Sequence, residues 1–195
     1  MKDTKNLIPE GHVVARKQIL IQEGKTETPE VNSGKLRTKS DKSEVEISNE
    51  DMEVTFDKNT GYLFAYTFKG KKFIKKGPEP DFWRAPTDNY FGNSFQKRAK
   101  GCKEVTCHPI LSDFSMGKNK EFVEVKTSYK LDSVSSAMNM TYHIYADGTI
   151  KVDNQFEFGG NTGNLTSLLR FGNSMILPLD YKNVSWYGRG AQENY

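Results

Sequence analysis

The sequence of 195 residues has no long apolar run, few cysteines and almost no helical periodicity. No stretch approaches the ~18 to 20 consecutive apolar residues of a membrane span, which indicates that the chain is not an integral membrane protein. Met1–Gln22 lacks the apolar core and cleavage site expected of a signal peptide. The chain is also shorter than the ~250 residues of a typical (β/α)₈ barrel, which excludes that catalytic architecture.

The two cysteines, Cys102 and Cys107, predict neither a disulfide nor a zinc site. If the segment between them is a strand, their Cα atoms lie ~16 Å apart, beyond the ~4.4 to 6.8 Å that a disulfide spans. Only His108 lies beside them and no second cysteine pair follows, which argues against zinc. We therefore expect free thiols and no metal site.

Positive charge is concentrated in one stretch of the chain. The net charge is only +3, but residues 69–104 carry ten Lys or Arg against four Asp or Glu, which gives +6 there and −3 elsewhere. Aromatic residues are interleaved with these cations, as in platforms that bind single-stranded nucleic acid. Because no nucleic-acid motif accompanies them, we favour a lysine-rich hairpin tip that keeps an edge strand soluble. Neither a nucleic acid nor a membrane is an expected partner.

Apolar and polar residues alternate along most of the chain, which predicts an all-β fold of half-buried strands. We expect a meander over Met52–Phe56, Tyr62–Phe68 and Phe73–Ile74, with a turn at Asp57–Gly61. Asp147–Gly148 predicts a hairpin. Further strands are expected at Val123–Tyr129, Met140–Tyr145, Thr149–Phe158, Leu168–Phe171 and Val184–Tyr187, and the one weak helical segment is Ser94–Lys100.

The first 44 residues differ from the rest in composition. Glu23–Ser43 mixes Gly, Ser and Pro with charges and has only two large apolar residues, Val31 and Leu36, which predicts a linker. Val13–Ile21 before it is typical of a single strand, which is too little for a domain. We therefore expect a terminal strand of a preceding sandwich in residues 1–22, a linker in 23–44 and the main domain in 45–195.

The densest cluster of polar and aromatic residues is Asp81–Gly92. The turn chemistry of Thr87–Asn89 fixes where Arg84 projects. Its guanidinium can bind a carboxylate, most simply that of Asp88, and so pin the loop, or it can bind the vicinal hydroxyls of a sugar. Aromatic rings here suit a sugar ring as well as a core. The candidate substrate-binding residues are Trp83, Arg84, Asp88, Asn89 and Tyr90.

A second cluster, beginning at Trp186, lies close to the end of the chain. Gly188 and Gly190 permit positive φ on either side of Arg189, so the chain can turn sharply there. The glycine spacing is not that of a phosphate-binding loop. We therefore expect a structural motif in which Arg189 reaches Glu193 at a domain seam.

Together the two clusters resemble the C-terminal region of the large β-galactosidases of glycoside hydrolase family 2. The resemblance rests on Trp83–Asn89 with Gly92, and on Trp186–Gly190 with Glu193–Tyr195, in this order. In addition, the start of the chain, Pro9–His12 followed by Arg16–Leu20, is similar to the last strand of the immunoglobulin-like domain that precedes this region. Two positions depart from the family pattern: Tyr90 stands where Asp is common, and Ala191–Gln192 replaces Pro-His or Pro-Gln.

The resemblance implies an antiparallel β super-sandwich of the galactose mutarotase kind, of which this chain holds only the leading part. It places the two carboxylates of a retaining mechanism, ~5 to 5.5 Å apart, on an upstream barrel, so no residue of this chain is assigned a catalytic role. The Mg and Na sites common in the family would also lie elsewhere, which leaves this chain without a cofactor. Lys71–Pro80 would form a loop at the mouth of the galactoside pocket.

Three functions are consistent with these residues. The first is a non-catalytic fragment that supports the barrel and edges the pocket, with a galactoside and the remaining parent domains as partners, and with a second copy as a means of covering unpaired edges. The second is a carbohydrate-binding sandwich that stacks sugars on Trp83, Tyr90 and Trp186. The third is a mutarotase-like epimerase that uses His108 or His143 as its acid, although their positions favour structural roles.

Overall fold

A computed structural model describes residues 34–86, 88–159 and 168–183, together with residues 19, 21 and 185. The chain divides into two compact units, one of residues 1–29 with 183–195 and one of residues 30–182. Every helix and strand of the described residues belongs to the second unit. Among the described residues, no helix is long and apolar enough to cross a membrane.

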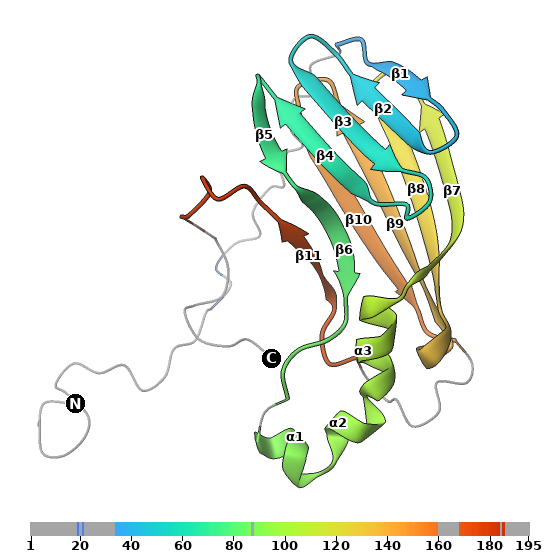
Figure 1. The fold of residues 1–195 in the computed structure, drawn as a ribbon, viewed down its shortest axis with the longest axis vertical. Coiled ribbons are helices and arrows are strands. Elements are labelled where there is room, and N and C mark those ends of the chain that lie inside the picture. Colours follow the sequence, from blue (N-terminus) through green and yellow to red (C-terminus); the bar gives the residue numbers. More distant parts are fainter. Residues whose placement is uncertain are drawn as a thin grey trace, which may run out of the picture. The chain divides into compact units, whose positions relative to one another are not determined.

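Two antiparallel sheets form the body of this unit (Figure 1). The first has five strands in chain order: β1 (Arg37–Ser40), β2 (Glu44–Ser48), β3 (Met52–Asp57), β4 (Leu63–Phe68) and β5 (Lys71–Ile74). The second has four, in the order β10-β9-β8-β7: β7 (Ile110–Lys118), β8 (Phe122–Leu131), β9 (Ser136–Tyr145) and β10 (Ile150–Glu157). This arrangement confirms the predicted all-β class.

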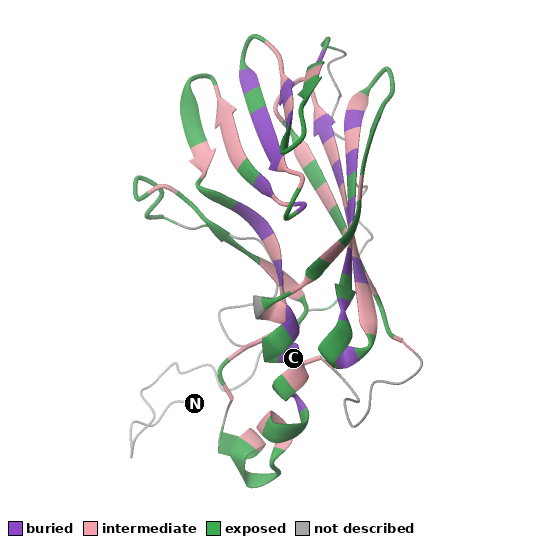
Figure 2. Cartoon of the chain, turned by 45° about the vertical axis from the view of Figure 1, so that its right-hand side comes forward, coloured by how far each residue is buried: buried purple, intermediate pink, exposed green. Residues whose placement is uncertain are grey.

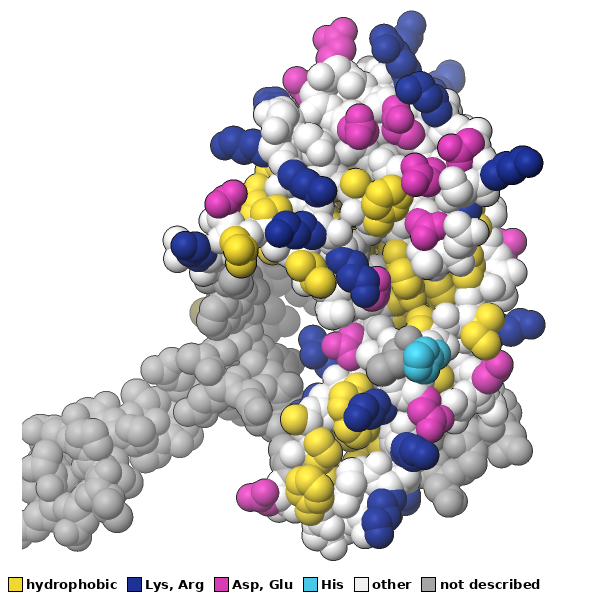
Figure 3. All heavy atoms as spheres, viewed as in Figure 1, with side chains coloured by type: hydrophobic (Ala, Val, Ile, Leu, Met, Phe, Trp, Pro, Cys, Tyr) yellow, Lys and Arg dark blue, Asp and Glu magenta, His cyan; other side chains and the backbone are white. Residues whose placement is uncertain are grey.

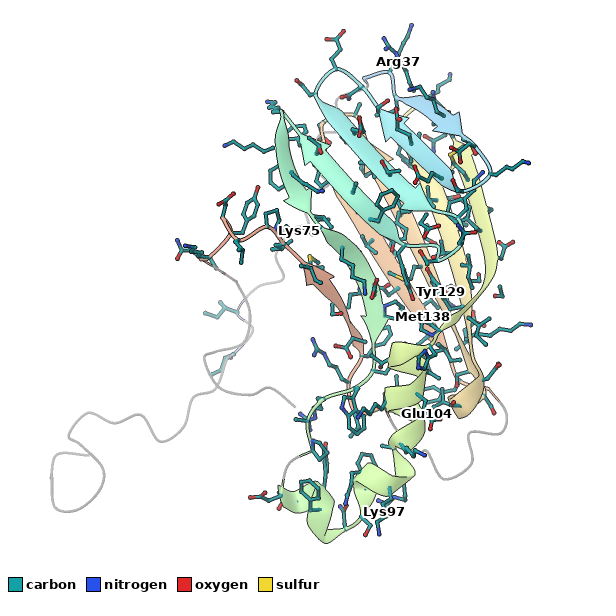
Figure 4. All side chains as sticks on the ribbon, in the orientation of Figure 1. Arg37, Lys75, Lys97, Glu104, Tyr129 and Met138 are labelled. Carbon is teal, nitrogen blue, oxygen red and sulfur yellow. The ribbon has the colours of Figure 1, made fainter. Side chains whose placement is uncertain are left out.

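The core lies between the two sheets, because the side chains that face inward from each sheet are mostly apolar. Buried positions alternate with open ones along β8 and β9 (Figure 2). Tyr129 and Met138 lie on the strands that line this core (Figure 4). The ring of Phe56 from the first sheet meets Tyr142 from the second edge-on, with centroids 5.0 Å apart. The two sheets therefore share one packed interior.

The two predicted turns are confirmed. Asp57 Oδ1 accepts the Asn59 N–H at 2.8 Å, and Gly61 then takes a φ of 76°, which glycine adopts without a steric penalty. Gly148, with a φ of 94°, joins β9 to β10. β3, β4 and β5 pair in sequence, as expected of the predicted meander.

A third, two-stranded sheet extends from the sandwich. β6 (Lys76–Asp81) continues from β5 and pairs with β11 (Gly172–Ile176), far along the chain. Gly77 lies where a Cβ would overlap the Leu63 carbonyl, so a glycine lets β6 pass directly against β4. This close approach fixes the direction in which β6 leaves the sandwich.

Three short helices follow β6: α1 (Asp88–Gly92), α2 (Phe95–Arg98) and α3 (Lys100–Cys107). α3 packs against the 3₁₀ turn η1 (Asp132–Val134), with Ala99, Cys102 and Val105 buried. A Cβ at Gly101 would come within 2.7 Å of the Ser133 carbonyl oxygen, so the glycine permits this contact. The helices are thus anchored to the second sheet through η1.

Several local predictions are wrong. The cysteine segment is helical, because the burial of Cys102 and Val105 and the packing of α3 on η1 outweigh the β-branched residues that favour a strand. By contrast, the helical segment predicted at Ser94–Lys100 is confirmed in part, since it contains α2 and the first residue of α3. Leu168–Phe171 is not a strand, since β11 begins at Gly172. The expected loop Lys71–Pro80 is strands β5 and β6.

The structure agrees with other predictions only in part. β1, with buried Leu36 before it, falls inside the range expected to be a linker, while the division of the chain into domains stays a prediction. Cys102 is a free thiol, and burial raises its pKa, which keeps it neutral and unreactive. Exposed Lys71 and Lys72 lie on β5, an edge strand, as the hairpin-tip interpretation expects. Most of Val184–Tyr187 and most of Val13–Ile21 lie outside the described residues.

Candidate functional site

The segment Asp81–Gly92, in which Thr87 is not described, leaves the end of β6 and enters α1. Phe82, near the start of the segment, is held by both its backbone and its side chain. The Phe82 N–H donates to Thr106 Oγ1 at 2.9 Å, and that hydroxyl in turn donates to the Cys102 carbonyl at 2.8 Å. The Phe82 ring is fully buried. The segment therefore starts from a point locked to α3.

Asp81 fixes the next residue and links the segment to β11. Its Oδ1 accepts the Trp83 N–H at 3.1 Å, and its Oδ2 pairs with Arg170 Nη1 at 3.2 Å. Arg170 lies just before β11, which pairs with β6. A single carboxylate thus holds together the end of one strand, the start of the other and the backbone of Trp83.

Arg84 lies against Tyr90, six residues later. Arg84 Nη2 donates to the Tyr90 hydroxyl at 2.5 Å, and its guanidinium carbon is 5.2 Å from the centre of the Tyr90 ring. The Tyr90 ring packs against Phe95 with centroids 5.0 Å apart, and Arg98 lies 5.3 Å from the Phe95 ring. Two arginines therefore flank a pair of packed aromatic rings, and this stack joins the segment to α1 and α2.

Trp83 has its own cation. Lys103 Nζ, from α3, lies 5.8 Å from the Trp83 ring centre, and the Trp83 side chain is half-buried. A half-buried indole with a cation beside it can stack on an apolar ring face or lie next to a polar group. This makes Trp83 the residue of the cluster best placed for a ligand.

The structure brings together some of the predicted site residues but not all. Trp83, Arg84 and Tyr90 are half-buried and belong to one packed group, whereas Asp88 and Asn89 are exposed at the start of α1. The bond that we describe for Arg84 goes to Tyr90, and the expected Arg84–Asp88 pair stays a prediction. The roles of these residues toward a substrate also stay predictions.

Residues outside the predicted set complete the group. They are Asp81, Phe95, Arg98, Lys103 and Thr106. Asp81 adjoins the motif and was open to inference, because an Asp two residues before a backbone N–H often accepts from it. The others come from α2 and α3, so only the fold brings them to the segment.

The surface over the helices is mixed in character. Apolar and basic side chains are interleaved there (Figure 3). Lys97 projects from α2 at the far end of the group, and Glu104 lies on α3 (Figure 4). Lys100 Nζ is 3.5 Å from Glu104 Oε1, and a hydrogen bond from Ser133 holds the pKa of Glu104 below its usual value. Glu104 is therefore a charged anchor of α3 rather than a proton donor.

Two histidines are candidates for a mutarotase-like reaction: His108 is the exposed residue directly after α3, and His143 lies on the outer face of the second sheet. His143 is in β9, and its Nε2 is 3.3 Å from Glu124 Oε2 on β8. Its Nδ1 is 3.6 Å from Asp153 Oδ2 on β10. Glu124 also pairs with Lys126 at 2.7 Å, and that hydrogen bond is the main reason why the pKa of Glu124 is lowered. His143 thus lies in a cross-strand charge network, and the epimerase reading stays a prediction.

Two further predictions concern the second cluster and a metal site. The second cluster, with Trp186, Gly188, Arg189, Gly190 and Glu193, lies outside the described residues. Among the described residues, no group of three or more His, Cys, Asp or Glu side chains is arranged to hold a metal ion. Burial is the main reason why the pKa values of Tyr62, Tyr129 and Tyr142 are raised; Tyr129 and Tyr142 belong to the core, and Tyr62 packs against it.

Comparison with known proteins connects this arrangement to one family. The family model described as "Beta galactosidase small chain" matches residues 48–195. A beta-galactosidase of Streptococcus thermophilus is 26% identical over 196 residues, which cover 100% of this chain and 19% of that protein. Those of Clostridium acetobutylicum and Priestia megaterium are 27% and 24% identical, each over 95% of this chain and over 20% and 18% of their own lengths. The chain spans about a fifth of the length of these curated relatives.

Proposed function

The chain belongs to the β-galactosidase small-chain family, and from this premise we propose that it is a non-catalytic part of a β-galactosidase. In this proposal the parent enzyme hydrolyses terminal β-D-galactosides with retention of configuration, and its two catalytic carboxylates lie outside this chain. The present chain supports the catalytic barrel and contributes one edge of the galactoside pocket.

One observation carries the proposal: relatives named beta-galactosidase align with 95% or more of this chain but with only about a fifth of themselves. The matched family is itself described as a small chain. A segment that recurs as a minor part of much longer enzymes fits the role of an accessory domain. Four fifths of each relative remain to supply the acid and the nucleophile.

The motif segment suits the edge of a sugar pocket. Asp88 and Asn89 are exposed at the start of α1, where a carboxylate and an amide can bind sugar hydroxyls as acceptor and donor. The Arg84–Tyr90 contact lies behind them and holds that turn in place. Trp83 offers a partly open indole face, as ring-stacking sugar sites do. Rigid support behind exposed polar groups is what orientation of a substrate requires.

The first test is an assay of the purified 195-residue chain with o-nitrophenyl β-galactoside. We expect no release of o-nitrophenolate above buffer, with the Streptococcus thermophilus beta-galactosidase as the active control and circular dichroism as the check of folding. Turnover that copurifies with the chain would overturn the non-catalytic role. A second test is the reading frame on both sides of the segment, which should encode a barrel upstream.

A second candidate function is a carbohydrate-binding module, and the pairing of Trp83 with Lys103 favours it. Such a module would bind galactose without hydrolysing galactosides. Calorimetric titration of the chain with galactose at millimolar concentration should then give a saturable heat that Trp83→Ala removes and Phe91→Ala leaves unchanged. A flat titration of the wild-type chain would count against this candidate and would leave the accessory role as the better account.

A further inference from the structure

The segment Phe171–Leu179 carries no charged side chain, although 27% of the residues of the chain are charged. It comprises β11 and the residues on either side of it. Most of its large apolar side chains are open to solvent, and so is the ring of Tyr181 shortly after it. The exposed group, each member at least 40% exposed, is Phe171, Met175, Ile176, Leu177, Leu179 and Tyr181.

β11 is also an edge strand. Within the described residues it pairs only with β6, so its other edge has no partner there. The register between the two strands shifts between Ser174 and Ile176, where two residues of β6 oppose one of β11. The extra residue therefore lies in β6, and β11 keeps the regular backbone that a further strand requires.

Two other edge strands, β5 and β1, are protected in ways that β11 is not. β5 carries the exposed lysines Lys71 and Lys72, and β1 is four residues long with Arg37 and Lys39. Charges and short length are the usual means by which edge strands avoid pairing with another chain. β11 is short, but it is uncharged and continues into an exposed apolar tail. Such an edge is open to pairing by strand addition.

The sequence of β11 is complementary to itself in one register. If two copies pair in antiparallel fashion about Ser174, Phe171 of one copy lies opposite Leu177 of the other, and Asn173 lies opposite Met175. Directly opposed residues of this kind stabilise a strand pair, and no two like charges face each other. The flanking residues Arg170 and Asp180 have opposite signs, and this register places them diagonally across the pair.

We propose that β11 is a homodimerisation edge, at which a second copy of this chain adds its own β11 antiparallel about Ser174. The contact is isologous, so each copy contributes the same residues twice. A stable dimer buries about 800 Å² per partner, which a five-residue strand cannot supply, so the apolar residues on both sides of β11 must contribute. The association is therefore weak and depends on concentration. The proposal stands apart from the galactosidase role, since no catalytic activity enters it.

The test measures the mass of the 195-residue chain by sedimentation velocity over a dilution series. We expect a dimer at high concentration that dissociates on dilution. Ser174→Lys places two like charges opposite each other at the twofold axis and should abolish the dimer. Ser115→Lys, an exposed position on β7, is the matched control and should leave it unchanged. Circular dichroism checks that each variant folds.

The register gives a sharper test. Ser174→Glu should also be monomeric alone, but an equimolar mixture of Ser174→Lys and Ser174→Glu should form a heterodimer. If Ser174→Glu fails to fold beside Glu79, Leu177→Lys mixed with Phe171→Glu tests the same register. A wild-type chain that is monomeric throughout the series would overturn the proposal and would favour a segment of a longer parent as the occupant of β11. A dimer that survives Ser174→Lys would overturn it as well.

Discussion

The sandwich and the region formed by β6, β11 and the helices bury their aromatic rings to different extents. Phe56 and Tyr142 are completely enclosed between two sheets of the same unit. In the second region Phe82 is buried and packs edge-on against Phe156 of β10, but Phe171, whose ring contacts both, is more than half exposed. One aromatic group is closed on all sides and the other is closed on one side only.

This difference shows where the fold is self-sufficient. Two facing sheets cover each other, so the apolar faces of β3 and β9 need no further partner. β6 and β11 form a single two-stranded layer, which cannot enclose apolar side chains on both of its faces. We therefore expect stability to come from the sandwich, and ligand or partner contacts to involve the second region.

The largest expected effect separates the two aromatic groups directly. Phe56→Ala should lower the free energy of unfolding by about 3 to 5 kcal/mol, because it leaves a cavity between two packed sheets. Phe171→Ala should cost about 1 kcal/mol or less, since more than half of that side chain is already in water. Urea unfolding of both variants measures the contrast, and equal losses would refute the division into a closed and an open region.

The next largest effect concerns the hydrogen bond that joins the end of β6 to α3 within the second region. Thr106→Val removes the acceptor of the Phe82 N–H and should lower the free energy of unfolding by about 1 to 3 kcal/mol, because the donor is left unsatisfied. Thr106→Ser keeps the hydroxyl and is the control. Thermal unfolding followed by tryptophan fluorescence reports the change near Trp83. A Val variant as stable as the Ser variant would show that the hydroxyl does not anchor the segment.

A smaller effect is expected inside the cation–aromatic stack. Tyr90→Phe keeps the ring but removes the hydroxyl that accepts from Arg84, which should cost about 0.5 to 1.5 kcal/mol. Tyr145→Phe, whose ring packs against Phe122, serves as the matched control. Both are measured by thermal unfolding. If the two variants melted alike, the Arg84–Tyr90 bond would contribute nothing to the rigidity of the segment.

The smallest effect concerns pH and the edge of the sandwich. The Glu44 and Ser43 N–H groups donate to Asp41 Oδ1, and these bonds hold the pKa of Asp41 below its usual value of 3.8. A lowered folded-state pKa stabilises the β1–β2 turn above pH 3.8, and this contribution is lost as the pH falls through the folded pKa. An NMR titration of the carboxyl group should show the low midpoint. In Asp41→Asn, the protection of the Ser43 and Glu44 amides against hydrogen exchange should no longer depend on pH in this range, once intrinsic exchange rates are taken into account.

Much of the sandwich was predictable because its strands carry local signals. Met52–Phe56 alternates strictly, and Asp147–Gly148 supplies the turn that joins its hairpin, so strand and turn required no knowledge of neighbours. β7 escaped prediction because Ile110–Lys118 does not alternate cleanly; its inward side chains are only partly covered. The motif Trp83–Asn89 was also identified from sequence, through its turn residues and its resemblance to a family.

The sequence alone determined the all-β class, the principal hairpins and the family, because strand periodicity, turn residues and short motifs are local properties. Only the tertiary structure decided that residues 100–107 form a helix, since the burial of Cys102 and Val105 and the packing of α3 on η1 outweigh local propensity. It also decided that β6 pairs with β11 and that Arg84 meets Tyr90. Contacts such as the β6–β11 pairing join segments far apart along the chain, and no local pattern can specify them.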